Sequence, residues 1–347
     1  MSGGGEAPTA SILIPVRNEE RWIRETAAAM RAQRFDGELE FLFIDGCSED
    51  RTRAVLEELA AKDGRIRVLD NPAREIPQAL NIALRAARGD WVARMDAHSW
   101  YPDDYVERGV ERLRRGDVEW VTGPAVPRPT GRWARRVAIA LGTKLGQGGS
   151  AKWSGGGSEG AAQVELELDT GVFAGVWPRA TLERLGGWDE GWPVNEDAEM
   201  AGRVLSAGGR IVCLTAMSAQ YAPRDSLRGL ARQYARFGFY RVKTSRRHPV
   251  ALRRSHLASA ALALTAVGAL LPLRVPARVS RAGLGAYGLA LGALSVRAGR
   301  EAGAARRDLA GLPVVLAVMH LGWGFGFLAG CARFGAPWAG VRRVLSP

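Results

Sequence analysis

The sequence predicts an α/β protein with a doubly wound parallel sheet, followed by a C-terminal helical region that associates with a membrane. Two observations lead to this expectation. Apolar, strand-like runs alternate with helical segments over the first part of the chain, which is the pattern of parallel βαβ units. The C-terminal part instead alternates apolar runs with clusters of arginine, a pattern typical of segments that meet an anionic membrane surface.

Four mainly apolar runs are expected to form neighbouring strands of the sheet. They cover residues 10–16, 39–44, 66–69 and 91–95, with helical patterns between them that end near 32, 61 and 87. Because crossovers between parallel strands are right-handed, the carboxyl ends of these strands should lie along one edge of the sheet. Ligands bind at that edge in open α/β sheets.

The second part of the first 245 residues is less regular. Further elements are expected at residues 103–115 (helix), 118–122 (strand), 164–174 (strand), 178–185 (helix), 196–207 (helix), 210–214 (strand) and 226–244 (helix). Between them, the glycine-rich segment 130–162 is expected to form a loop over the sheet's edge.

The net charge of +12 is concentrated at the C-terminal end. Residues 241–347 hold 16 basic and 2 acidic side chains, spread around apolar stretches at 257–273, 282–296 and 309–332. At about 1.5 Å per residue, only the third stretch comfortably crosses a hydrocarbon core of about 30 Å. We therefore expect two to three membrane helices, with the basic side in the cytoplasm, and no nucleic-acid partner. Alternatively, these stretches lie in the membrane interface as a hairpin, or they form a buried helical subdomain.

The remaining composition excludes several classes of protein. Three cysteines lie far apart without a metal-binding or disulfide spacing, which favours reduced thiols. Residues 1–9 are glycine-rich and lack the features of a signal peptide, so a disordered N-terminus is expected. No G-x-G-x-x-G follows the first strand, which argues against a nicotinamide cofactor.

Asp96 and His98 follow the fourth predicted strand. In an extended backbone, residues i and i+2 point to the same side, so the carboxylate and the imidazole are expected to face one ligand. This pair suits Mn²⁺, or Mg²⁺ held mainly through the carboxylate. The alternative is that Asp96 caps a turn and His98 packs on the surface.

Several stretches, taken in order, resemble the family 2 glycosyltransferases with the GT-A fold. The matching segments are SILIPVRNEE (11–20), DGCSEDRT (45–52), DAH (96–98), GGWD (186–189), NED (195–197) and 221–240. The pattern of His98, Tyr101, Pro102, Asp104 and Tyr105 is most similar to the succinoglycan-type exopolysaccharide transferases. The resemblance implies a GT-A domain with a doubly wound mixed sheet over 10–245, before the C-terminal region 246–347. This domain has a nucleotide-binding half (10–125) and an acceptor half (126–245).

The resemblance also implies roles for residues at the first two strand ends. Pro15, Arg17 and Glu19 would line the nucleotide pocket, and Asp45 would accept a hydrogen bond from the base or ribose. The alternatives are that Asp45 only stabilises a turn and that Arg17 is a solvated charge. Asp50 is expected to cap the following helix instead.

Asp96 and His98 stand where the family has its metal-binding D-x-D, with His98 in place of the usual second carboxylate. A cation there would neutralise the departing diphosphate. Glu196 and Asp197 match the family's E-D pair, and the resemblance implies that Asp197 is the base that deprotonates the acceptor. Alternatively, both only stabilise a helix N-terminus.

Four further residues are expected to contact the acceptor or the diphosphate. Gln233 and Arg236 resemble the family's Q-x-x-R-W, with Phe237 in place of tryptophan. Their i, i+3 spacing puts both on one helix face, although the same basic face could rest on lipid headgroups. Asp169 is a candidate for acceptor contact, and Trp188 is either an acceptor platform or a core residue.

Together these features predict an inverting transferase that uses a nucleotide-diphosphate sugar, expected to be a UDP-sugar. The acceptor would be a lipid-linked saccharide or polysaccharide at the cytoplasmic face of the inner membrane, alongside other polysaccharide-assembly proteins. One alternative is a nucleotide-sugar pyrophosphorylase, but the glycine-rich basic loop of such enzymes is replaced by residues 17–20 (RNEE). The other alternative is a non-catalytic membrane assembly partner, against which the complete set of acidic motif residues argues.

Overall fold

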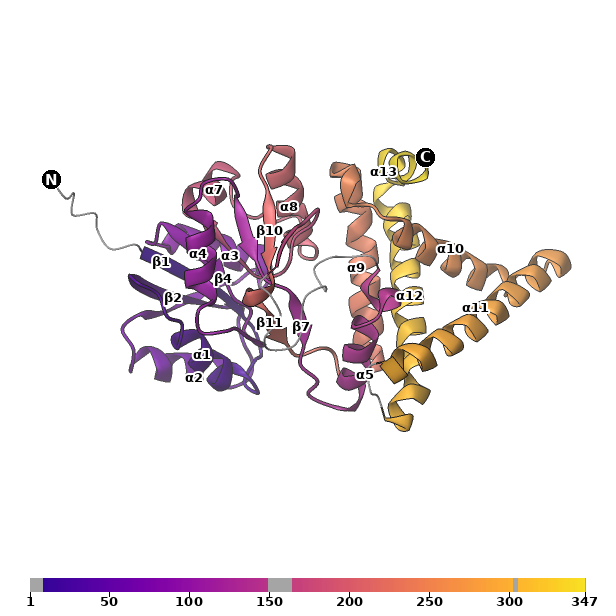
Figure 1. Ribbon diagram of the computed structural model, residues 1–347, viewed down its shortest axis with the longest axis horizontal. Coiled ribbons are helices and arrows are strands. Elements are labelled where there is room, and N and C mark those ends of the chain that lie inside the picture. Colours follow the sequence, from indigo (N-terminus) through magenta and orange to yellow (C-terminus); the bar gives the residue numbers. More distant parts are fainter. Residues whose placement is uncertain (1–8, 149–163, 302–304, 347) are drawn as a thin grey trace. The chain divides into compact units, whose positions relative to one another are not determined.

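A computed structural model describes residues 9–148, 164–301 and 305–346 of the chain (Figure 1). The chain divides into two compact units. The first unit comprises residues 1–126 and 154–221, and the second comprises residues 127–153 and 222–347. The helix at 227–247, which we expected to belong to the GT-A domain, thus lies in the second unit. The expected disordered stretch at the N-terminus lies almost entirely outside the described residues.

The first unit is built on an eight-stranded sheet with the order β3-β2-β1-β4-β9-β6-β10-β8. Its strands are β1 (Thr9–Val16), β2 (Glu38–Asp45), β3 (Ile66–Asp70), β4 (Trp91–Arg94), β6 (Trp120–Thr122), β8 (Glu165–Glu167), β9 (Gly175–Pro178) and β10 (Ile211–Leu214). The four strands β1 to β4 are parallel, as predicted. Strand β9 runs antiparallel to β4 and β6, and β8 runs antiparallel to β10, so the sheet is mixed.

Both faces of the sheet are covered, which explains the continuous apolar runs in the sequence. Ile12 and Phe43 pack in one cluster with Ile23 and Met30 of helix α1. Leu13, which points to the other face, is equally inaccessible to solvent. Strands buried on both faces have no polar side to alternate with the apolar one.

Helices connect the strands and cover the sheet. They are α1 (Ile23–Arg31), α2 (Thr52–Ala60), α3 (Ile76–Ala86), α4 (Tyr105–Leu113), α7 (Arg179–Arg184) and α8 (Glu196–Ser206). A small second sheet has the order β5-β11-β7, formed by β5 (Ser99–Trp100), β7 (Ala125–Pro127) and β11 (Ala219–Tyr221). Helix α3 packs against β1 and β2, and α4 packs against β6 and β9.

The segment expected to be a glycine-rich loop is helical over its first half. Helices α5 (Arg132–Leu141) and α6 (Lys144–Gln147) occupy it, and its remainder lies largely outside the described residues. The glycines misled the prediction because they lie at the ends of α5, at positions 131 and 142. Between them, Ala134, Val137 and Ala140 form an apolar stripe that is buried and stabilises the helix.

The second unit is a set of packed helices around α12 (Arg306–Phe334). The others besides α5 and α6 are α9 (Leu227–Arg247), α10 (Arg254–Gly268), α11 (Arg274–Glu301) and α13 (Trp338–Leu345). By length and composition, α11 and α12 are candidate membrane spans. The second apolar stretch, 282–296, is by itself short for a membrane span. Its helix, α11, extends beyond the stretch at both ends and has 28 residues, which is long enough for a candidate span.

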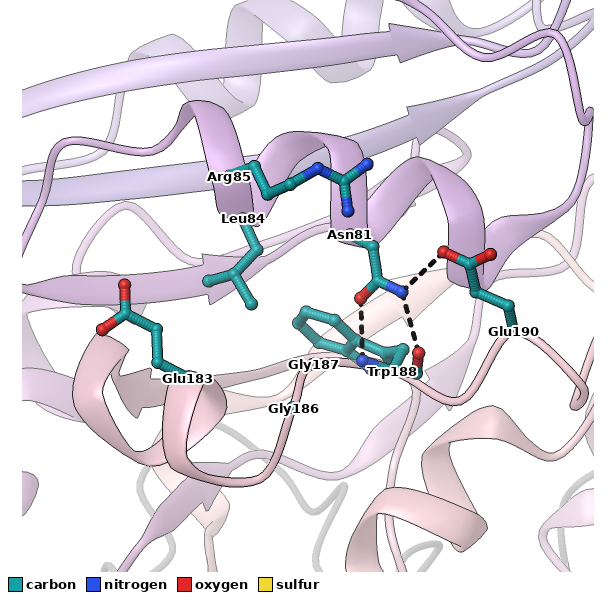
Figure 2. Close-up of a pocket in the computed structure, with 8 residues that line it drawn as sticks. All are labelled: Asn81, Leu84, Arg85, Glu183, Gly186, Gly187, Trp188 and Glu190. Atoms are coloured by element: carbon teal, nitrogen blue, oxygen red, sulfur yellow. Dashed lines mark hydrogen bonds between the residues drawn. The ribbon is translucent and has the colours of Figure 1, made fainter.

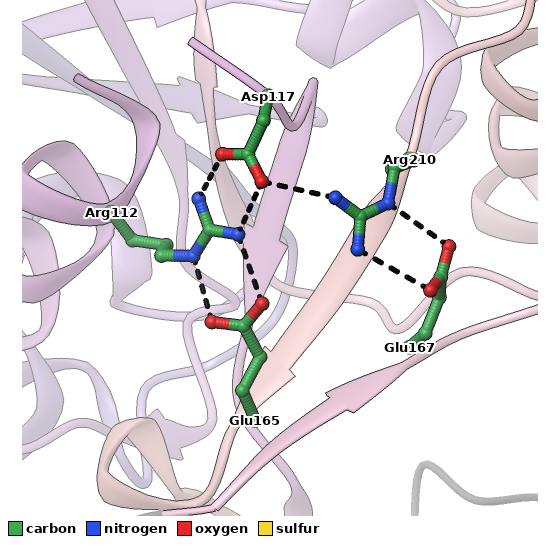
Figure 3. Close-up of polar contacts among 5 residues, drawn as sticks. All are labelled: Arg112, Asp117, Glu165, Glu167 and Arg210. Carbon is green, nitrogen blue, oxygen red and sulfur yellow. Dashed lines mark hydrogen bonds and ion pairs between the residues drawn. The ribbon is translucent and has the colours of Figure 1, made fainter. Parts of the chain in front are cut away.

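An ion-pair network holds the edge strand β8 in place (Figure 3). Arg112 of α4 donates to both oxygens of Glu165 at 2.7 and 2.9 Å and to both oxygens of Asp117 at 2.5 and 3.0 Å. Arg210 bonds Asp117 at 3.0 Å and Glu167 at 3.2 Å. Hydrogen bonds from Arg112 lower the pKa of Asp117 to about 2. Two paired forks of this kind give the edge strand a defined register.

The two arginines of this network are expected to contribute unequally to stability. Arg112 is 5% exposed, whereas the Arg210 side chain is 43% exposed. We expect Arg112→Met to destabilise the first unit by about 1–3 kcal/mol, because it removes charge-assisted hydrogen bonds. Arg210→Met should change stability by less than about 0.5 kcal/mol. Denaturation midpoints of both variants test this, and equal losses would contradict it.

Candidate active site

The turns after β1 and β2 are joined by reciprocal hydrogen bonds. The backbone N–H of Asn18 donates to Ser48 Oγ at 3.0 Å, and the N–H of Glu49 donates to Asn18 Oδ1 at 2.8 Å. Asn18 has a left-handed backbone, with φ of 54°, which asparagine adopts more readily than most residues. These bonds fix the two strand ends as one rigid surface.

Asp45 is buried at this surface and belongs to a turn. Its Oδ1 accepts from the hydroxyl of Ser48 at 2.6 Å, and both its oxygens accept from the Ser48 N–H at 3.3 Å. Asp45 therefore stabilises this turn. A nucleotide contact remains a prediction. Asp50 accepts from the N–H of Thr52 at 2.9 Å, so it stabilises the start of α2 as expected, although the helix cap itself is Arg51.

A second link joins the end of β1 to the segment after β4. Glu19 Oε1 lies 3.1 Å from His98 Nδ1, and the Glu19 N–H donates to Thr52 Oγ1 at 2.8 Å. Glu19 therefore touches the ends of three elements. It also orients the His98 ring through Nδ1, in the way that a carboxylate orients a metal-binding imidazole.

The centre of the site is Arg94, the last residue of β4. Its Nε donates to Asp96 Oδ1 at 3.0 Å and its Nη1 donates to Glu196 Oε1 at 3.0 Å. Only 2% of Arg94 is exposed. Burial alone would lower the pKa of this guanidinium, but the charges of Asp96 and Glu196 outweigh burial and raise it. Arg94 thus holds Asp96, which follows β4, close to Glu196, which begins α8.

Glu196 is the more buried member of the acidic pair, and it is strongly perturbed. Burial raises its pKa from 4.5 to about 7, and the neighbouring Asp197 charge adds to the rise, while Arg94 opposes it. A carboxyl group that is buried and ion-paired in this way cannot readily reach an acceptor hydroxyl. Its position indicates a supporting role for Glu196.

Asp197 lies in the first turn of α8 and is partly exposed. One of its oxygens accepts from the N–H of Ala198 at 2.8 Å, and the helix N-terminus stabilises its negative charge. The loop before β9 approaches this turn closely at Gly171, where a Cβ would lie 2.3 Å from the Asp197 carbonyl oxygen. Of the two acids, Asp197 has the geometry of a base. Asn195, expected to cap α8, makes no side-chain cap bond because its backbone is left-handed.

The site is compatible with a divalent cation that completes its coordination with a ligand's phosphates. Asp96 uses Oδ1 for its hydrogen bond with Arg94, so its second carboxylate oxygen, Oδ2, is not engaged by that bond. Within residues 9–148, 164–301 and 305–346, no three acidic, histidine or cysteine side chains are grouped closely enough to hold a metal ion. Asp96 and His98 lie in a turn, closed by the bond from the Ser99 N–H to the Asp96 carbonyl at 3.0 Å, and not in the extended backbone that was expected. Mg²⁺ and Mn²⁺ at diphosphate sites commonly use one or two protein ligands and the phosphates, so Asp96 alone satisfies this requirement and His98 as a second ligand remains a prediction.

The remaining predicted residues of the first unit lie at different depths. Pro15 is half-buried at the end of β1, and Arg17 is exposed beside Gly46. Asp169 is exposed between β8 and β9. Trp188 is only 2% exposed and packs edge-on against Trp177, so its indole is a core side chain and not an acceptor platform.

Asn81 of α3 holds the turn that contains Trp188 (Figure 2). The backbone N–H of Trp188 donates to Asn81 Oδ1 at 2.8 Å. Asn81 Nδ2 donates to the backbone carbonyl of Trp188 at 2.8 Å and to Glu190 Oε1 at 3.0 Å. A hollow of about 500 Å³ lies beside this turn. Among the described residues that line it, Trp188 is the only predicted site residue, so the hollow is separate from the acidic site.

Gln233 and Arg236 belong to α9 of the second unit. Gln233 is half-buried and Arg236 is exposed. Their shared helix face is as predicted, whereas their contact with the acceptor or diphosphate remains a prediction.

Sequence reasoning missed Arg94 and the residues that join the turns. A signal for Arg94 was present, because an arginine inside the apolar run WVARM must either leave the core or find carboxylate partners. Nothing in the sequence identified Asn18 as a partner of Glu49 or Thr52 as a partner of Glu19, since those bonds depend on how the two turns meet.

The comparisons with known proteins agree with this architecture. The mannosyltransferase PcManGT from Pyrobaculum calidifontis, solved with GDP-Man and Mn²⁺, has a TM-score of 0.56 at 23% identity, over 92% of this chain and 88% of that one. S. aureus TarS 1–349, solved with UDP, has a TM-score of 0.52 at 14% identity, over 94% and 92%. These likenesses show the fold. The chain thus has the GT-A fold.

Sequence comparison gives the family. The model for glycosyl transferase family 2 matches residues 11–164. The succinoglycan biosynthesis protein ExoA of Rhizobium meliloti (strain 1021) is 32% identical over 345 residues, covering 94% of this chain and 96% of that protein. The putative glycosyltransferase EpsH of Bacillus subtilis (strain 168) is 31% identical over 103 residues, 30% of each protein. The chain belongs to the family 2 glycosyltransferases, which confirms the resemblance seen in its motifs.

Replacing Arg94 should disable the site without any direct contact to a substrate. Arg94→Met leaves Asp96 and Glu196 without their shared partner, and displacement of a reacting group by about 1 Å can cost about 100-fold in rate. We expect a loss of at least that size in kcat, with Arg94→Lys retaining more activity because it keeps the charge. Steady-state kinetics with circular dichroism as a folding control tests this, and near-normal kcat in a folded Arg94→Met variant would contradict it.

The raised pKa of Glu196 should also make stability depend on pH. Between about 4.5 and about 7, the folded state keeps a proton that the unfolded state loses, so this group lowers stability as the pH rises through that interval. Glu196→Gln, which mimics the protonated form, should remove this contribution. Thermal unfolding midpoints of both proteins across that pH range test it, and parallel pH profiles would contradict it.

Proposed function

We propose that this chain is an inverting transferase that moves a sugar from a nucleotide-diphosphate sugar to a lipid-linked saccharide or polysaccharide acceptor. The observation that carries the proposal is the double ion pair of Arg94 with Asp96 and Glu196, beside a partly exposed Asp197. Such a displacement requires a group that binds the cation beside the leaving diphosphate, here Asp96, and an accessible base, here Asp197.

In this mechanism Asp197 takes the proton of the acceptor hydroxyl while the hydroxyl oxygen forms its bond to the anomeric carbon. The bond between that carbon and the diphosphate oxygen breaks on the opposite face, and the electron pair leaves with the diphosphate. Glu196 remains paired with Arg94 and keeps the first turn of α8 in place. One displacement with attack opposite the leaving group inverts the anomeric configuration.

Asp96, with His98 as the second ligand, would hold Mn²⁺ or Mg²⁺ against the diphosphate, where the cation neutralises charge on the leaving group. The contact between Glu19 and His98 Nδ1 supports this assignment, because it presets the imidazole orientation. The Mn²⁺ in the solved PcManGT complex gives a precedent in the same fold.

The nucleotide would bind along the joined ends of β1 and β2. Pro15, Arg17 and Glu19 would line its pocket, and Asp45 would exchange part of its bonding to Ser48 for the base or ribose. We propose UDP as the nucleotide. The solved neighbours contain GDP-Man in one case and UDP in the other, so the fold accommodates either base.

Asp169 is the acceptor contact that we propose for the first unit. Gln233 and Arg236, on α9 of the second unit, are proposed independently for contact with the acceptor or the diphosphate. Arginine suits a phosphate-bearing acceptor or the diphosphate because its planar fork donates two parallel hydrogen bonds. We place the reaction at the cytoplasmic face of the inner membrane, alongside other polysaccharide-assembly proteins. The basic C-terminal region and the similarity to a succinoglycan biosynthesis protein support this location.

Replacing Asp197 and replacing Asp96 should change different kinetic properties of the enzyme. Asp197→Asn should lower kcat by about 100- to 10,000-fold, the usual contribution of a general base, while donor binding stays intact. Asp96→Ala should weaken donor binding and remove its dependence on added cation. Glu190→Gln, an exposed acid elsewhere in the unit, is the matched control. Membranes given labelled nucleotide sugar provide the assay, and full transfer by Asp96→Ala would eliminate the metal role.

A ligand panel separates the donor classes without knowledge of the acceptor. Binding to the native state raises the unfolding temperature in proportion to the logarithm of ligand concentration over Kd. We expect UDP with Mn²⁺ or Mg²⁺ to stabilise the protein more than GDP with the same cation, and chelator to remove the effect. A larger shift with GDP would overturn the choice of UDP but not the reaction class.

A further inference from the structure

The two candidate membrane helices of the second unit differ in how much of their apolar surface is covered. In its most apolar window, α12 is 39% buried, whereas α11 is 11% buried. Between α12 and its neighbours, the backbones approach so closely that only glycine fits. A Cβ on Gly326 would lie 2.0 Å from the Ala235 carbonyl oxygen of α9, and one on Gly324 would lie 2.0 Å from the Ser259 carbonyl oxygen of α10.

Helix α9, which packs along α12, is unsuited to a hydrocarbon environment. Its exposed residues include Arg228, Arg232, Arg236, Arg246 and Arg247. If α12 crossed a bilayer in this packing, α9 and its arginines would have to enter it as well, and isolated arginines in the hydrocarbon core are costly. Helix α12 is the better covered of the two helices, and Val314 and Phe325 are its exposed large hydrophobic side chains.

The uncovered apolar surface belongs to α10, α11 and the turn between them. Of the seventeen large hydrophobic side chains that are exposed among the described residues, ten fall between positions 264 and 296. The turn itself is the most exposed part, with Leu270 at 85% and Leu273 at 56%. A contiguous exposed surface of this kind marks a site of interaction with a membrane or another protein.

The exposed residues of α11 follow the helical repeat. An apolar stripe runs along one face through Val275, Val279, Ala282, Ala286, Leu289, Ala293 and Val296, all exposed. Arg274, Arg278 and Arg281 are also exposed, each one position before a member of that stripe and thus about 100° around the helix. An apolar stripe flanked by a basic one is the pattern of a helix that lies in the plane of a membrane surface.

The same residues argue against α11 as a span. The uncharged part of α11 between Arg281 and Arg297 holds 15 residues, about 22 Å of helix, which is short of a hydrocarbon core of about 30 Å. Insertion of the turn through the bilayer would also carry three arginines across it. At the surface, those arginines can instead reach lipid phosphates while their stems lie along the apolar face.

We propose that the hairpin of α10 and α11 inserts into one leaflet of a membrane that contains anionic lipid, with Leu270, Leu271 and Leu273 at its tip, and that α12 is not a transmembrane span. The occupant of the uncovered surface is thus the headgroup and upper acyl region of one leaflet. This inference goes beyond the proposed reaction, since it is tested by measuring lipid binding and not sugar transfer.

Vesicle flotation of the whole chain tests whether this surface binds a membrane. The wild type should bind vesicles of phosphatidylcholine with phosphatidylglycerol more strongly than phosphatidylcholine alone, and added salt should reduce the difference. The variant Leu270→Ser with Leu271→Ser and Leu273→Ser should bind about tenfold more weakly or worse. The control is Val314→Ser with Phe325→Ser on α12, whose side chains are 45% and 44% exposed, and it should bind like the wild type.

Three outcomes would overturn the proposal. The first is loss of binding in the α12 variant but not in the hairpin variant. The second is equal binding by both variants. The third is a hairpin variant that changes oligomeric state in lipid-free solution while vesicle binding persists, because a second copy of the chain would then cover the surface.

Depth measurements separate surface insertion from a span. A fluorophore on cysteine introduced at Leu271 or at Leu289, near the middle of α11, should be quenched best by quenchers near the lipid headgroups in both cases. Wild-type protein carried through the same labelling serves as the blank for its three natural cysteines. Strongest quenching at Leu289 by groups at the bilayer centre would show that α11 spans the membrane, contrary to the proposal.

Discussion

The active site depends on the burial of one charge. A guanidinium that is 2% exposed would be strongly destabilising without partners, because its hydration is lost. Arg94 is stabilised by Asp96 two residues ahead and by Glu196 about a hundred residues later in the chain. Since removing one partner of a buried ion pair costs far more than the pair contributes, the three residues must come together for the first unit to fold well.

This requirement couples the two halves of the reaction. Asp96 stands at the end of β4, where the donor diphosphate would bind, and Glu196 begins the helix that carries Asp197. Strand β9 lies beside β4 in antiparallel register, and Gly171 lets the loop before it touch the Asp197 backbone. In the proposed mechanism, the distance between the leaving group and Asp197 would thus be set by packed backbone and an ion pair, and not by mobile side chains.

The sequence predicted the β1 to β4 half well because the information there is local. Each strand is a short apolar run between helical patterns, and parallel crossovers follow one hand. The antiparallel placement of β8 and β9 was not predictable in this way, because their pairing depends on strands far apart in the chain. Helix α5 was missed because glycine content was read as a loop signal, although its glycines lie at the helix ends.

The site residues show the same division between local and distant information. Short motifs located Asp45, Asp96, His98, Glu196 and Asp197 because each follows a strand or begins a helix. Two of these residues have partners that are distant in the chain: Glu19 for His98, and Arg94 for Glu196. The sequence left two roles open for Trp188, an acceptor platform or a core residue. Its burial against Trp177 shows that it is a core residue.

The C-terminal helices show why composition alone cannot identify a membrane contact. Helices α11 and α12 both pass the test of length and hydropathy, and α12 is the more apolar of the two. Yet the glycines of α12 lie in close contact with α9 and α10, whereas the exposed face of α11 has no protein partner among the described residues. What decides between a core helix and a lipid-facing one is which side chains remain uncovered after folding. Of the seventeen exposed large hydrophobic side chains among the described residues, ten are on α10, α11 and the turn between them.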